Sequence, residues 1–222
     1  MKLWILLLSV SLFAHNLWIK KEDNGFKLFY GHLHFGKNSI EKRAIKYDPK
    51  KVKYIICKNR NEIKNIDFVK KYPIVVKKEC EEVYIFMDNG FFTKTPYGIK
   101  NLPKNRVKMP LYSFRSFKSV KYLNKNSKKA ITNSLEIVLL NDPKRIADEA
   151  RLLILFNKKP VSGAVVTYDS KSSGITSQDG RINLKVKRAG VQNISATIKR
   201  KCKSNECDKI RYSTTLNFEI EK

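Results

Sequence analysis

The chain has 222 residues, with 46 Lys or Arg against 20 Asp or Glu and a formal net charge of +26. Its length accommodates one large β domain or two small ones. A net positive charge of this size is compatible with binding to nucleic acid or to an anionic membrane surface. The lysines are spread along the whole chain and form no long block, so we interpret them as solvated faces and predict no nucleic-acid partner.

The first 14 residues have the layout of a secretory signal peptide. Lys2 supplies a short basic region, LWILLLSVSLF is apolar, and Ala14 is a small residue at the exit. The apolar run is short for a permanent membrane-spanning helix. No second apolar run follows to hold the chain in a membrane, which disfavours the alternatives of an anchor or a first buried strand. We therefore predict cleavage after Ala14 and a periplasmic mature chain that begins at His15.

Strand signals outnumber helix signals over residues 15–142. The stretch LWIKKEDNGFKLFYGHLHFG predicts two strands around a turn at 23–25, because Asn-Gly favours positive φ. The runs VKYIIC, YPIVVKK and EEVYIFMDNGFFTKTPYG continue the β pattern, with another tight-turn candidate at 88–90. The stretch SFRSFKSVKYL, residues 113–123, is expected to form a short helix or an excursion at a strand edge. SLEIVLLNDP predicts a strand that ends at Pro143.

From about residue 150 onward, short strands and turns alternate. The expected corners carry Gly or Pro and lie roughly ten residues apart: Pro160 with Gly163, Gly174, Asp179-Gly180 and Ala189-Gly190. Alternating apolar positions between such turns indicate an antiparallel sandwich. The sequence therefore predicts an all-β protein with two antiparallel β-sandwich-like domains. The first spans 15–142 and the second, an Ig-like β-sandwich, spans 150–222.

The four cysteines suggest disulfides, because their number is even and the chain is predicted to be exported. Cys202 and Cys207 lie between two strand-like runs, so a bridge there would join the ends of a hairpin. Cys57 ends one run and Cys80 opens another, so antiparallel pairing would bring them together. The sequence alone leaves three connectivities open, as well as four free thiols. Neither a C-x-x-C motif nor a Cys/His pairing points to zinc.

All three histidines lie within residues 15–34, at His15, His32 and His34. In an extended strand, His32 and His34 would share one face while Leu33 and Phe35 point toward a core. The hairpin would return this strand toward His15, gathering three imidazoles and the α-amine that cleavage exposes. Such a nitrogen-rich set suits Ni(II) or Cu(II). The alternative is a half-solvated face with no metal.

Several stretches resemble a family of exported bacterial proteins, described as periplasmic components of nickel or cobalt uptake systems. They are AHNLW at the leader junction, GHLH, MDNGFFTKTPYG, and the region from LLILFNKKPVSGAVV to VQNISA. The resemblance covers most of the mature chain and is thinnest at 37–80. Its C-terminal part also resembles small Ig-like or carboxypeptidase-regulatory modules. The family implies a nickel-binding partner of a membrane transporter, with a site at His15, His32 and His34. The strong positive charge of this chain is a departure from the family's role, because it disfavours long-range attraction of a metal cation.

We therefore expect a periplasmic Ni(II)-binding accessory protein that delivers metal, as an ion or as a chelate, to an inner-membrane nickel/cobalt transporter. Cu(II) and Co(II) are the alternative ions. A copper carrier or histidine-brace oxidase is the second hypothesis, and an oxidase would need an exposed aromatic face from residues such as Trp18, Tyr30 or Phe35. A structural or adhesive module with incidental histidines is the third. The sequence has no nucleophile elbow, phosphate loop or Ser/His/Asp set, so we predict no catalytic residues and no conventional enzyme.

Overall fold

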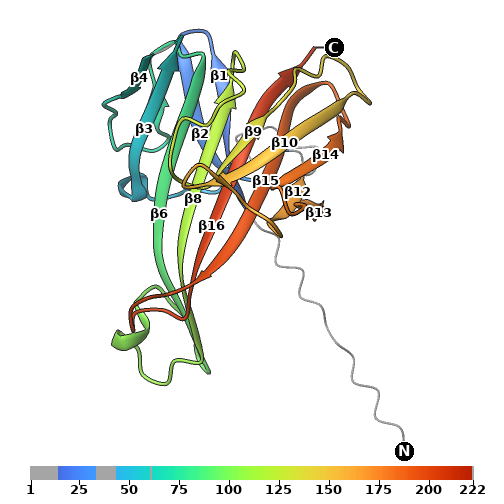
Figure 1. The fold of residues 1–222 in the computed structure, drawn as a ribbon. Coiled ribbons are helices and arrows are strands. Elements are labelled where there is room, and N and C mark those ends of the chain that lie inside the picture. The colour runs from blue at the N-terminus through green and yellow to red at the C-terminus, as the bar shows by residue number, and fades with distance from the viewer. Residues whose placement is uncertain (1–14, 34–43, 61, 222) are drawn as a thin grey trace, which may run out of the picture.

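The structure, a computed structural model, describes residues 15–33, 44–60 and 62–221. Within these ranges the chain is all-β, as predicted, and its helical content is two 3-10 turns, η1 (Pro49–Lys51) and η2 (Lys104–Arg106). Neither of these described helical segments is long and apolar enough to cross a membrane. Figure 1 shows long strands that twist around one another and carry smaller sheets against their sides.

The strands follow in chain order: β1 (Asn16–Glu22), β2 (Gly25–Gly31), β3 (Val52–Asn59), β4 (Glu62–Asn65), β5 (Val75–Val76), β6 (Glu82–Thr95), β7 (Gly98–Lys100), β8 (Tyr112–Leu123), β9 (Glu136–Leu139), β10 (Glu149–Phe156), β11 (Lys159–Pro160), β12 (Val165–Tyr168), β13 (Lys171–Ile175), β14 (Arg181–Lys185), β15 (Gly190–Lys201) and β16 (Lys209–Ile220).

The largest sheet has nine strands and runs through the whole molecule. Its order is β13-β12-β15-β16-β8-β6-β3-β4, with β7 paired to β6. Neighbours in it are antiparallel except β8 and β16, which pair in parallel. The stretch 113–123, expected as a short helix or an edge excursion, therefore forms a central strand. That expectation is wrong because β8 pairs with β6 on one side and β16 on the other, and successive apolar and polar side chains are buried over 119–123.

Two smaller sheets cover opposite faces of the large one. Tyr122 packs in a core with the β1-β2-β5 sheet, and its neighbour Leu123 packs in a second core with β9, β10 and β14. Successive side chains of a strand point to opposite faces, so the two cores lie on the two sides of β8. This arrangement agrees with the predicted sandwich-like fold. The proposed division at 142–150 stays a prediction, and it falls around the connection between β9 and β10, which are paired.

The disulfides join the cysteine pairs that lie close under the predicted strand pairing. Cys57 is bonded to Cys80 and Cys202 to Cys207, with Cα atoms 5.5 and 5.7 Å apart. The first bridge ties the end of β3 to the segment before β6, and the second closes the loop between β15 and β16. Structural disulfides of this kind are typical of oxidising compartments.

Three predicted turns differ from the structure. The corner expected at Gly174 is wrong, because Gly174 lies within β13 and is paired with Val166. The 23–25 hairpin forms, but its loop residues are Asp23 and Asn24, and Gly25 opens β2 with φ +145°. A Cβ on Gly25 would lie 1.9 Å from the Val76 carbonyl oxygen, so glycine is needed there. The turn expected at 88–90 is wrong. It is a β-bulge inside β6, in which the Gly90 amide donates to Asp88 Oδ1 at 2.9 Å.

Candidate metal centre

The β1-β2 hairpin places His15 beside His32. The two strands pair from Glu22↔Gly25 to Asn16↔Gly31, so the two histidines flank the last pair of the ladder. Their ring centroids lie 4.8 Å apart with the ring planes at 55°. The hairpin thus brings His15 and His32, which are far apart in the sequence, into direct contact.

The structure revises how His32 is presented. β2 ends at Gly31, so His32 lies just beyond the strand and not within it. Leu33 is buried, as expected of a residue facing the core. His34 and Phe35, which were predicted to continue the strand, lie outside the described residues. The pairing of His32 with His34 on one strand face therefore stays a prediction.

An aromatic pair joins β1 and β2 near the strand ends that carry the histidines. Trp18 is fully buried and stacks on Phe29 with centroids 4.4 Å apart, and Leu33 packs against both. Adjacent positions of β1 and β2 thus anchor the strand ends that carry His15 and His32. Because Trp18 is buried, it cannot contribute to the exposed aromatic face that a histidine-brace oxidase would need around its metal.

Ser170, from the opposite half of the chain, contacts His32. Its hydroxyl lies 3.3 Å from His32 Nδ1. Asp169 and Ser170 form the two-residue loop between β12 and β13, both with positive φ, which is the geometry of a tight hairpin turn. When Nδ1 carries the proton and donates to Ser170, the lone pair of the ring lies on Nε2. A hydrogen bond of this kind is the usual way that a metal-binding histidine is oriented.

Lys118 and Tyr30 complete the surroundings of His15. Lys118 Nζ, projecting from β8, donates to the His15 carbonyl oxygen at 2.5 Å and lies 5.2 Å from the centre of the Tyr30 ring. Tyr30 in turn meets His15 edge to face at 5.7 Å. Burial, with a smaller contribution from the charge of Arg211, lowers the pKa of Lys118 to about 8. These contacts fix the backbone of His15 against the large sheet.

The environment favours neutral imidazoles. Burial lowers the pKa of His15 below its usual range, and the positive charges of His32 and Lys118 lower it further. Burial also lowers the pKa of His32. A metal ion binds only the unprotonated ring, so both side chains are ready to coordinate at neutral pH. The nearby ammonium of Lys118 opposes an incoming cation, so affinity has to come from the donor nitrogens themselves.

The described residues supply two of the predicted ligands. Within 15–33, 44–60 and 62–221, no group of three or more His, Cys, Asp or Glu side chains is placed to hold a metal. The third histidine, His34, lies outside these ranges. The α-amine of His15 would be a ligand only after cleavage at Ala14, which also lies outside them. The chemistry of the donors that are present, two adjacent neutral imidazoles, fits a late transition metal ion.

Sequence reasoning did not identify Ser170 or Lys118 as part of this region. The turn at Asp169-Ser170 contains no glycine and no Asn-Gly pair, so it carries no hairpin signal. Lys118 lies in the stretch that was not recognised as a central strand. Both residues lie near the histidines because of the strand order of the nine-stranded sheet, and local sequence patterns do not reveal that order.

Compared with known protein families, curated proteins and solved structures, the chain has no match.

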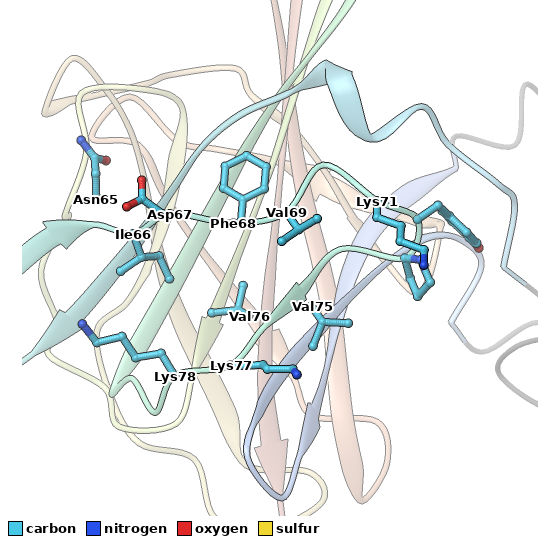
Figure 2. Close-up of a pocket in the computed structure, with 12 residues that line it drawn as sticks. Asn65, Ile66, Asp67, Phe68, Val69, Lys71, Val75, Val76, Lys77 and Lys78 are labelled. Carbon is cyan, nitrogen blue, oxygen red and sulfur yellow. The ribbon is translucent and has the colours of Figure 1, made fainter.

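A groove elsewhere on the surface has a different chemistry. It has a volume of about 770 Å³ and is formed by the segment between β4 and β5. Figure 2 shows Phe68 and Val69 on one side of it and Val75 and Val76 on the other, with Lys77 nearby. Its lining residues include neither histidine nor cysteine. The groove is therefore unsuited to the metal ions that the histidines favour.

Proposed function

We propose that this protein binds Ni(II) outside the cytoplasm and passes it to an inner-membrane nickel/cobalt transporter. The ligands in this proposal are His15, His32 and His34, together with the α-amine that removal of residues 1–14 would expose. The observation that supports the proposal most directly is the 4.8 Å separation of the His15 and His32 rings. The two disulfides fit the oxidising compartment that this role requires.

The proposed ligand set explains the position of His15. An N-terminal histidine offers its amine and its ring to one metal ion, and the His32 ring lies close enough to add a third nitrogen. Nitrogen-rich sites of this kind favour square-planar or tetragonal ions such as Ni(II) and Cu(II). Cu(II) binds more tightly than Ni(II) to most sites, so affinity in vitro does not identify the physiological metal. Metal content after expression in the native compartment is the relevant measurement.

The proposal is tested on protein purified after natural processing. Its N-terminus is sequenced, its bound metal is measured, and Ni(II), Co(II) and Cu(II) are titrated into the metal-free form. We expect a first residue of His15, bound nickel, and loss of high-affinity binding in His15→Ala, His32→Ala and His34→Ala. A version with one glycine before His15 separates the amine from the ring and should bind at least about tenfold more weakly.

Three results would contradict the proposal. These are a mature chain that begins at another residue, unchanged affinity in the glycine-extended version, and unchanged affinity in the triple histidine variant. Nickel uptake by cells that carry the triple variant links the site to transport, because we expect uptake to fall to the level of cells without the protein. Uptake at the normal level in those cells would separate the histidines from the transport role.

A further inference from the structure

Four long strands of the large sheet extend beyond the two smaller sheets and form an arm. β6, β8, β15 and β16 continue together to the loops at 96–111 and 202–208, which lie at the lower left of Figure 1. Residues 94–112 and 199–209, which comprise these loops and the adjoining strand ends, are called the tip below. The β1-β2 hairpin and the β9-β10 strands lie toward the other end of the arm.

The tip concentrates exposed apolar side chains. Of the thirteen large apolar residues that are exposed in the described ranges, six belong to the tip. They are Tyr97, Ile99, Leu102, Met109, Leu111 and Tyr112, and Tyr97 at the apex of the β6-β7 hairpin is 83% exposed. Soluble proteins rarely gather exposed apolar side chains without a partner for them.

The tip is held together by polar contacts that leave these side chains outside. The Lys104 amide donates to the Glu206 carbonyl oxygen at 2.7 Å, and Lys104 Nζ forms an ion pair with Asp208 at 2.5 Å. The disulfide between Cys202 and Cys207 closes the second loop. The two loops are thus joined to each other, and the apolar side chains are presented on an ordered support.

The tip is also strongly basic. It contains ten Lys or Arg and two acidic residues, Glu206 and Asp208, and no Asp or Glu occurs anywhere in 89–135. Asp208 is already paired with Lys104. The exposed apolar residues therefore sit in a region where basic side chains far outnumber acidic ones. A partner for this surface needs negative charge and an apolar interior at the same place.

We propose that the tip docks on an anionic lipid bilayer. In this arrangement Tyr97, Ile99 and their apolar neighbours enter the boundary between headgroups and acyl chains, and the surrounding lysines contact lipid phosphates. The long stems of the lysines allow their charges to remain at the headgroup level while apolar groups lie deeper. The inference goes beyond the proposed function and does not depend on the metal site.

The test measures binding of the full chain to vesicles by co-sedimentation. Vesicles of phosphatidylcholine mixed with phosphatidylglycerol are compared with vesicles of phosphatidylcholine alone. We expect binding to the anionic vesicles that weakens as salt is added, and little binding to the neutral ones. Tyr97→Ser with Ile99→Ser, and separately Lys100→Glu with Lys108→Glu, should each weaken binding at least about tenfold.

Matched controls change other exposed residues, away from the tip. Val165→Ser with Ile175→Ser removes exposed apolar side chains from β12 and β13, and Lys171→Glu with Lys185→Glu reverses exposed charges. These variants should bind anionic vesicles like the parent chain. Equal binding to both kinds of vesicle, or tip variants that bind like the parent, would overturn the proposal.

Analytical sedimentation of the protein without vesicles tests whether the tip instead binds a second copy of the chain. A dimer that forms at rising concentration and is lost in Tyr97→Ser with Ile99→Ser would assign the tip to a second copy of the chain, which also overturns the proposal. A monomer supports it. Ni(II) titration of each tip variant should match the parent, so that loss of vesicle binding is distinguished from failure of the metal site.

Discussion

Lys121 of β8 and Glu136 of β9 form a buried ion pair, with Lys121 Nζ 2.8 Å from Glu136 Oε1. The same ammonium lies 2.8 Å from Glu82 Oε2, so it is shared by two buried carboxylates. Glu136 also accepts hydrogen bonds from the backbone amides of Ile131 and Thr132. One cation thus links the large sheet to the first strand of the sheet that covers its second core.

Lys121→Met should destabilise the protein by about 3–5 kcal/mol, because it leaves the buried Glu136 without its cation and leaves Glu82 with Lys58 alone, at 3.6 Å. The matched control is Lys125→Met, whose side chain is 73% exposed and pairs with Glu81 at the surface. The control should cost less than about 1 kcal/mol. Urea unfolding of both variants measures the difference in free energy of unfolding. Similar values for the two would show that the buried network contributes little.

The two disulfides should contribute unequally to stability. Cys57 and Cys80 are separated by 23 residues, and Cys202 and Cys207 by 5. Loop-closure entropy in the unfolded chain then gives about 3 kcal/mol for the first bridge and about 2 kcal/mol for the second. Replacing each pair by alanine and measuring unfolding in urea tests this order. A larger loss from the Cys202–Cys207 pair would contradict it.

Metal affinity should depend on pH in a defined direction. The pKa of His15 and that of His32 are both lowered, so each ring stays neutral below the usual histidine pKa of about 6.5. As pH falls below about 8, protonation of the free amine should weaken binding first, and protonation of the His15 and His32 rings should add to the loss only below the usual histidine range. Below the pKa values of all the ligands it should fall steeply, because each of the three imidazoles and the amine of the proposed site loses one proton on metal binding, and each such proton contributes about a tenfold loss per pH unit.

Calorimetric titration of Ni(II) between about pH 5 and pH 8 measures this dependence. His32→Ala removes one competing proton, so the slope at low pH should be shallower than that of the parent chain by about a factor of ten per pH unit. Tight binding that persists unchanged at pH 5 would exclude these imidazoles as ligands.

Ser170→Ala should weaken metal binding without unfolding the protein. The hydroxyl orients His32 through Nδ1, and loss of such a contact to a ligand typically costs about 10–100-fold in metal affinity. Ser173→Ala, in the adjacent strand, is the control, because that hydroxyl bonds only the nearby Lys171 carbonyl oxygen in the described contacts. Thermal unfolding should be alike in the two variants. Equal metal affinity in the two would remove Ser170 from the site.

Local sequence signals predicted the parts of the fold that depend on neighbouring residues. The hairpin that brings His15 to His32 was expected from the turn signal at 23–25, although the loop ends one residue earlier because Gly25 already belongs to β2. The strand order brought Cys57 near Cys80 and Cys202 near Cys207, and the structure selects these pairs from the connectivities that the sequence left open. These features need only alternation of apolar residues, turn residues and short separations along the chain.

Pairing between strands that are distant in the chain could not be predicted from local sequence patterns. Nothing local in the stretch 113–123 reveals that it lies between β6 and β16, because the partner strand β16 is far away in the chain. The bulge at Asp88 resembles a turn in sequence, but Arg115 on the next strand pairs with the Asp88 carboxylate at 2.7 Å, and β6 continues past it. Ser170 and Lys118 reach the histidines by the same long-range order.

The position of β16 governs when the molecule can assemble. β16 is the last strand of the described chain, yet it lies between β8 and β15 near the middle of the large sheet. A nascent polypeptide therefore holds β8 and β15 with exposed hydrogen-bonding edges until β16 has been synthesised. Contacts between such distant segments slow folding, and open strand edges recruit other chains into aggregates. Truncations or stalled synthesis before residue 209 should therefore be cleared by chaperones and proteases.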